Sequence, residues 1–151
     1  FGEVIMGHVG AMDHYEYRAV GDIVNTASRI EGLNKQLGTR ILVSKEVLQG
    51  IEGFITRELG SFLLLGKTKP LSLYELVAKN HQDNINKPYS DFVMSLHMFQ
   101  AQHWGEASKG FENFIAEYGE DGPSRYYLDL CRQYLVCPPT EWDGVIRVTK
   151  K

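Results

Sequence analysis

Hydrophobic and polar residues alternate near the start of the chain and then take up a helical period. Two alternating segments, 3–10 and 15–19, lie four residues apart and predict a β-hairpin. From Asp22 to Leu37 apolar residues recur mostly every three or four positions, which predicts an amphipathic helix. Gly38 follows, and glycine is favoured just after a helix C-terminus. We therefore expect a hairpin that leads directly into a helix.

The next part of the chain is typical of short strands. Strands are expected at 40–43, 54–59, 62–65 and 72–77, and a short helix is expected after Ser44, a good N-cap residue. Strands interleaved with helices indicate an α/β or α+β layered fold. Of these two, we expect the α+β class.

The composition then changes. Residues 79–88 are polar and carry no helix cap, so they predict a linker. Across 89–151 the hydrophobic residues form three stripes with a helical period, and Pro123 suits the first turn of the last helix. The predicted organisation is an α+β part over 1–78, the linker, and a helical tail whose end is anchored by Trp142.

Composition limits the functional classes. A net charge of −3 and a pI near 6.0 give no electrostatic argument for binding nucleic acid or an anionic membrane. The two cysteines, Cys131 and Cys137, lack the spacing of a metal site and are typical of reduced thiols in a cytoplasmic protein. No apolar run approaches the roughly 20 residues that span a bilayer. Because the chain starts at Phe1 within a strand-like alternation, we expect it to be a piece of a longer protein.

The predicted first helix carries the most distinctive polar residues. Asn25 and Arg29 lie four positions apart and so share one helix face, close to a flexible Gly21. Arginine offers five donors in a rigid fork and asparagine adds an amide, a combination that suits an oxygen-rich anion such as a polyphosphate. From the pattern alone, an ordinary solvated polar face remains an open alternative.

An ordered set of motifs resembles the second half of a class III adenylate/guanylate cyclase catalytic domain. The set comprises residues 2–10, 17–31 and 38–44, then Arg57-Glu58-Leu59-Gly60, Gly66-Lys67, Pro70 and Tyr74-Glu75-Leu76. The resemblance covers residues 1–78 in order and with the family's spacing. It implies that this part is the C-terminal half of a ferredoxin-like cyclase domain.

The resemblance also implies roles for single residues. Asn25 and Arg29 would contact the nucleotide and stabilise the pentavalent phosphorus of the cyclisation transition state, while Arg18, Gly21 and Lys67 would be nucleotide-binding residues. The family's Mg²⁺ or Mn²⁺ ions bind aspartates of the upstream half, so no metal site is expected in this chain. The family's active site forms between two antiparallel catalytic domains, which implies a homodimer that binds ATP or GTP, and an isolated chain without activity.

Two positions depart from the family pattern. Arg18 stands where adenylate-forming members carry a residue that reads adenine, and arginine is a donor only. It would either donate to guanine or pair with Glu16 on the same strand face. Leu65 stands where many members have a phosphate-binding lysine, which leaves Lys67 and Lys69 nearby.

The helical tail has a resemblance of its own. Residues 104–107 followed by Phe111 resemble a tetratricopeptide-like helical pair, and only about one and a half repeat units are present. We expect these helices to pack on the α+β part or on a partner subunit.

The leading hypothesis is thus a fragment of an adenylate cyclase that converts ATP to cyclic AMP and pyrophosphate in intracellular signalling. The alternatives are a guanylate cyclase, or a catalytically inactive cyclase-like module that binds nucleotide or partners.

Overall fold

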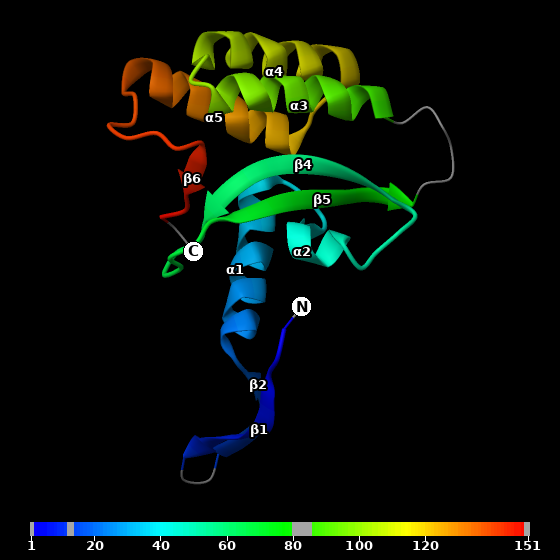
Figure 1. Cartoon of the computed structure of the whole chain (residues 1–151), viewed down its shortest axis with the longest axis vertical. Coiled ribbons are helices and arrows are strands. Elements are labelled where there is room, and N and C mark those ends of the chain that lie inside the picture. Colours follow the sequence, from blue (N-terminus) through cyan, green and yellow to red (C-terminus); the bar gives the residue numbers. More distant parts are fainter. Residues whose placement is uncertain (1, 12–13, 80–85, 150–151) are drawn as a thin grey trace.

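The computed structural model describes residues 2–11, 14–79 and 86–149. Its helices and strands are mixed in the α+β manner, which confirms the predicted class (Figure 1). The elements are, in order, β1 (Ile5–Ala11), β2 (His14–Val20), α1 (Asp22–Leu37), β3 (Leu42–Ser44), α2 (Lys45–Leu48), β4 (Phe54–Leu63), β5 (Leu71–Lys79), α3 (Asn86–Gln100), α4 (Trp104–Tyr118), α5 (Gly122–Val136) and β6 (Val145–Arg147).

The hairpin and first helix form as predicted. β1 and β2 pair antiparallel, from Ile5 opposite Val20 to Ala11 opposite His14. Helix α1 ends at Gly38, which adopts the left-handed conformation expected of a C-terminal glycine. The hairpin extends away from the rest of the molecule, beyond the N-terminal end of α1 (Figure 1). The turn predicted between the two strands includes residues 12 and 13, which lie outside the described residues.

The main sheet has four strands in the order β3-β5-β4-β6. The sequence predicted separate strands at 54–59 and 62–65, and this prediction was wrong, because β4 runs unbroken from Phe54 to Leu63. Its ladder with β5 is irregular between Glu58 and Gly60, where Gly60 has a φ of 95°. A glycine that accommodates such an irregularity gives the sequence signal of a strand break without ending the strand. Strand β6, which was not predicted, pairs parallel with β4.

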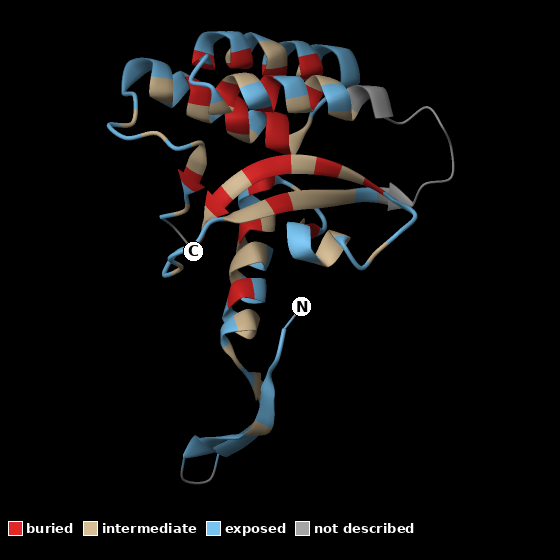
Figure 2. Ribbon diagram, viewed as in Figure 1, coloured by how far each residue is buried: buried red, intermediate tan, exposed pale blue. Residues whose placement is uncertain are grey.

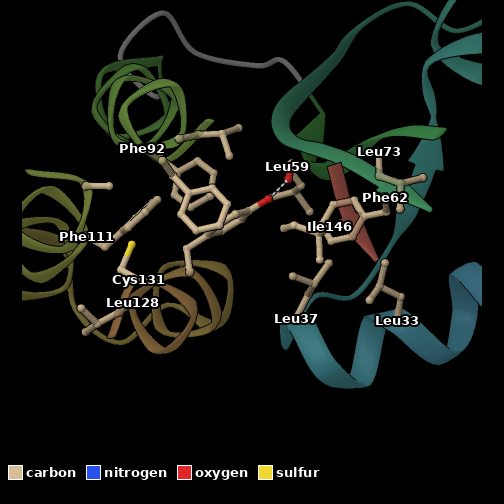
Figure 3. Packing of buried hydrophobic residues seen from close by; sticks show 14 of the residues in the cluster. Leu33, Leu37, Leu59, Phe62, Leu73, Phe92, Phe111, Leu128, Cys131 and Ile146 are labelled. Atoms are coloured by element: carbon tan, nitrogen blue, oxygen red, sulfur yellow. Dashed lines mark hydrogen bonds between the residues drawn. The ribbon is translucent and has the colours of Figure 1, made fainter. Parts of the chain in front are cut away.

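Helices α3, α4 and α5 lie together above β4 in Figure 1, the C-terminal end of α1 reaches α5, and α2 contacts β3 and β5. The aromatic side chains of the tail helices pack against one another in the core, where the Tyr127 ring contacts those of Phe92, Phe99 and Phe111. Tyr127 also donates its hydroxyl hydrogen to the carbonyl of Leu59 in β4 (Figure 3). The tail and the sheet therefore share one hydrophobic core.

A buried ionic cluster also joins the tail to the sheet. Arg57 of β4 donates to Glu75 of β5 through Nε (3.0 Å) and to Asp121 through Nη1 (2.9 Å). Asp121 in turn caps α5, because its carboxylate accepts from the backbone N–H of Ser124 at 2.9 Å. The guanidinium also lies over the Phe92 ring, 4.8 Å from its centre. One arginine thus connects two strands to two tail helices.

The predicted linker is only partly outside regular structure. Strand β5 continues to Lys79 and α3 begins at Asn86, while residues 80–85 lie outside the described residues. Trp142 packs on Phe99 and Trp104 and donates its indole N–H to the carbonyl of Gln100 at 2.8 Å, so its predicted anchoring role is confirmed. In the described ranges, every helix is too short or too polar to cross a membrane.

Burial differs sharply along the molecule (Figure 2). Every described residue of the hairpin is exposed or only partly buried. In α1 the first member of the hydrophobic core is Leu33, and Leu37 follows one turn later. There α1 approaches α5 closely: a Cβ on Gly122 would lie 2.3 Å from the carbonyl oxygen of Leu37, so only glycine fits. The C-terminal half of α1 is thereby fixed on the core, while its N-terminal half extends towards the hairpin.

Candidate functional site

Helix α1 presents the two residues singled out from the sequence. Its N-cap, Gly21, is extended and has no side chain to cap the helix, and the Thr26 hydroxyl donates to the carbonyl of Asp22 at 2.9 Å. Asp22 in the first turn places a negative charge where the helix dipole favours one. One turn further on, Asn25 and Arg29 project together from the part of α1 that lies outside the hydrophobic core.

Asn25 and Arg29 line the same cleft, which has a volume of about 340 Å³. The cleft is bounded by α1, by the residues that follow β4 and by the segment that follows β6; its lining includes Asn25, Ser28, Arg29, Gly32, Leu64, Leu65 and Val148. Asn25 is exposed and Arg29 is half-buried. In the described part of the chain, neither side chain takes part in an ion pair or a side-chain hydrogen bond. Their donors are therefore available to an anion in the cleft.

Lys67 lies beside these residues but is engaged differently. Its ammonium group pairs with the Asp22 carboxylate at 2.5 Å, and only 16% of the Lys67 side chain is exposed. It lines a second, larger cleft of about 630 Å³ on the apolar side of α1, between that helix and β3. The sequence placed Asn25, Arg29 and Lys67 in one site. The structure brings the first two together and holds Lys67 at the adjoining edge through Asp22.

Arg18 is in the hairpin and pairs with Glu16 two residues earlier on β2. Both side chains are well exposed, and Arg18 does not line either cleft of α1. The pairing with Glu16, one of the two interpretations from the sequence, is therefore present. The exposed pair contributes little to stability, about 0–1 kcal/mol.

Sequence reasoning missed two kinds of lining residue. Leu64 and Leu65 were assigned to a strand, but they lie in the turn after β4 and face the cleft. Val148 comes from the far end of the chain, where its backbone N–H donates to the carbonyl of Leu63 at 3.0 Å. The only sequence signal for it was the apolar residues around Arg147, a segment that is too short to predict a strand by itself.

The described residues do not fit a divalent metal ion. Within them, no three His, Cys, Asp or Glu side chains lie close enough together to hold one. Glu31, the acidic residue nearest to Arg29 in α1, also lines the cleft, and Asp22 is already paired with Lys67. No chemical step is therefore assigned to a metal bound by this part of the chain.

Comparison with known proteins gives three similar curated proteins that are named as adenylate cyclases. Adenylate cyclase 1 of Rhizobium meliloti (strain 1021) is 40% identical over 77 residues, which covers 50% of this chain and 12% of the relative. The adenylate cyclase of Anabaena cylindrica is 41% identical over 81 residues, 51% of this chain and 16% of that protein. A terminal-differentiation-specific adenylate cyclase of Dictyostelium discoideum is 27% identical over 139 residues, 87% of this chain and 6% of that protein.

These matches support a relationship to cyclases. The chain spans less than a fifth of the length of each of these relatives. No family model matches it, and no solved structure does.

Proposed function

We propose that the chain is part of an adenylate cyclase and supplies Asn25 and Arg29 to its active site. The observation that carries the proposal is that both side chains open onto one cleft with their donors uncommitted in the described structure. The similarity to proteins named as adenylate cyclases supports it. The proposed substrate is ATP, and the proposed products are cyclic AMP and pyrophosphate.

In this reaction the ribose 3′-oxygen forms a bond to the α-phosphorus, and the bond from that phosphorus to the pyrophosphate oxygen breaks. The 3′-hydroxyl gives up its proton, and the leaving group departs as pyrophosphate. Negative charge accumulates on the oxygens around phosphorus in the transition state. The Arg29 guanidinium and the Asn25 amide would donate hydrogen bonds to those oxygens, a form of stabilisation that is strongest when the donors are already oriented.

The proposed assembly is a homodimer, with Mg²⁺ or Mn²⁺ bound by residues outside this chain. The 151-residue chain alone is accordingly expected to be inactive. A longer form of the protein that carries the metal ligands is expected to be active. Measurable cyclic AMP production by the isolated chain would contradict this division of roles.

The test is made on such a longer form, with magnesium or manganese and with ATP and GTP as separate substrates. Arg29→Ala and Asn25→Ala are each expected to lower kcat by about 10²–10³, the usual effect of removing one transition-state donor. Arg132→Ala is the matched control, because Arg132 is an exposed arginine on α5 that pairs with Glu112 outside the cleft. An unchanged kcat with a raised KM would mean that Asn25 and Arg29 only bind substrate.

The same assay tests the substrate. Because Arg18 pairs with Glu16, Arg18→Thr is expected to leave the ratio of activities on ATP and GTP nearly unchanged. A preference for GTP that disappears in Arg18→Thr would instead identify a guanylate cyclase in which Arg18 reads the base.

A further inference from the structure

The turn after β4 has a geometry that depends on glycine. The backbone N–H of Lys67 donates to the carbonyl of Leu64 at 2.9 Å, which closes a four-residue turn with Gly66 in its third position. Gly66 has a φ of 69°, the sign that a type II turn requires at that position. An L-residue there is strained, whatever space surrounds it.

The Arg29 side chain lies directly against this turn. A Cβ added to Gly66 would be 3.2 Å from Nη2, 3.4 Å from Nη1 and 3.6 Å from Cζ of Arg29. All three atoms belong to the guanidinium, so this group occupies the space where the side chain of any other residue at position 66 would begin. A methyl group at residue 66 would displace the guanidinium by a few tenths of an ångström.

A second contact holds the same turn on the same helix. Lys67, the residue after Gly66, pairs with Asp22 in the first turn of α1. Asp22 and Arg29 are seven residues apart, so they lie two helical turns from each other on one face of α1. The Lys67–Asp22 ion pair thus holds the turn against the first turn of α1. Gly66 of the same turn contacts the Arg29 guanidinium two helical turns later.

We propose that Gly66 is a positioning residue that sets where the Arg29 guanidinium lies in the cleft. This inference rests on the proposed function, since it assigns Gly66 an effect on the step that Arg29 serves. The bare Cα of Gly66 lets the guanidinium lie close against the backbone, and the Lys67–Asp22 pair keeps that backbone next to α1. Small errors in the position of a catalytic group are costly to rate, so the identity of residue 66 matters although it offers no reacting group.

The test compares two glycines with similar positive φ angles. Gly53 has a φ of 76°, but a Cβ there would have nothing within 4 Å. Gly66→Ala and Gly53→Ala therefore introduce similar backbone strain, and only Gly66→Ala contacts Arg29. In the longer, active form, Gly66→Ala is expected to lower kcat on the order of tenfold with a smaller change in KM. Gly53→Ala is expected to keep the wild-type kcat.

A spectroscopic measurement on the 151-residue chain makes the result independent of catalysis. The side-chain Nε–H signal of Arg29 is assigned by its loss in Arg29→Ala. It is expected to shift in Gly66→Ala and to stay in place in Gly53→Ala. The dispersion of the backbone amide signals in the same ¹H–¹⁵N spectra also shows whether each variant remains folded.

The outcomes separate the two ideas. An unmoved Arg29 signal in folded Gly66→Ala overturns the positioning role, and so does an equal loss of kcat in both glycine variants. If Arg29→Ala keeps the wild-type kcat, the proposed function fails instead. In that case the Arg29 signal still decides whether Gly66 holds the guanidinium.

Discussion

The β1–β2 hairpin and the tail helices carry similar kinds of side chain and bury them to opposite extents. In the hairpin, Ile5 is 77% exposed and Tyr17 is 63% exposed, whereas Phe111 and Tyr127 of the tail are fully buried. The tail aromatics make ring contacts around Tyr127, but the described ring contact of Tyr17 is with His8 on the neighbouring strand. Apolar residues in the hairpin therefore contribute little to the stability of this chain, while those in the tail dominate it.

Helix α1 connects the two regions, and the candidate site lies at their boundary. Leu33 and Leu37 belong to the core, whereas Asn25 and Arg29 lie nearer the hairpin and outside the core. Substitutions at these two polar residues should therefore change chemistry without unfolding the molecule. The comparison also predicts where stability resides.

The largest effect is expected from removing the tail. A chain that ends at Ala78 loses α3, α4, α5 and β6, and with them the cover of the sheet face that carries Leu59 and Phe62. Exposed apolar surface of this kind promotes aggregation. We expect the 1–78 chain to be insoluble or to lack a cooperative thermal transition, as measured by circular dichroism and light scattering. A soluble 1–78 chain that melts cooperatively would show that the tail is not needed for folding.

A pair of tyrosine substitutions compares the two regions directly. Tyr127→Ala removes a buried ring and its hydrogen bond to Leu59, which should lower the free energy of unfolding by about 3–5 kcal/mol. Tyr17→Ala, in the exposed hairpin, should change it by less than about 0.5 kcal/mol. Urea denaturation of both variants measures the difference. Equal losses of stability would mean that the hairpin is part of the cooperative core.

Two arginine substitutions make the same comparison for charge. Arg57→Met leaves the carboxylates of Glu75 and Asp121 without their buried partner and should cost about 3 kcal/mol in the free energy of unfolding. Arg18→Met breaks only the exposed pair with Glu16 and should cost less than about 1 kcal/mol. Urea denaturation at low ionic strength measures the free energy of unfolding of both variants. A small effect of Arg57→Met would indicate that water replaces the guanidinium in the cluster.

The smallest expected effect is a difference in reactivity between the two thiols of the tail, one buried and one exposed. Cys131 is fully buried, and burial raises its pKa to about 12, so at pH 8 it remains a protonated thiol shielded from reagents. Cys137, just past α5, is exposed. Ellman's reagent should modify one thiol in the folded chain and two in urea, and Cys137→Ser should abolish the fast reaction. Rapid modification of both thiols in the folded chain would show that α5 opens readily.

The local elements could largely be predicted from the sequence because their signals are local. The hairpin, α1 with its C-terminal Gly38, and the start of the last helix near Pro123 all follow from alternation, helical period and capping residues. The pairing of Asn25 and Arg29 on one face follows from helix geometry alone. The errors occur where a tertiary contact overrides the local signal, as at Gly60. That glycine marks an irregularity inside one strand, next to the hydroxyl of Tyr127.

The rest of the candidate site could not be predicted, because it depends on segments that are distant in sequence. Val148 reaches the cleft only because β6 pairs with β4, and Lys67 is drawn to Asp22 by an ion pair across 45 positions. A single sequence gives no pattern for such contacts. The tetratricopeptide-like character of the tail, the dimer and the identity of the nucleotide all stay predictions.

The parallel pairing of β6 with β4 has a mechanical consequence. Strands β5 and β6 pair with β4 on opposite sides. The segment between them, which contains α3, α4 and α5, is therefore hydrogen-bonded to β4 at both of its ends. A force applied to this segment is shared by the β4–β5 and β4–β6 hydrogen bonds. It is transmitted to the end of β4, where the turn that contacts Arg29 begins. The tail is therefore attached to β4 at two places, through β5 and through β6, and a force on the tail acts on β4 from both sides.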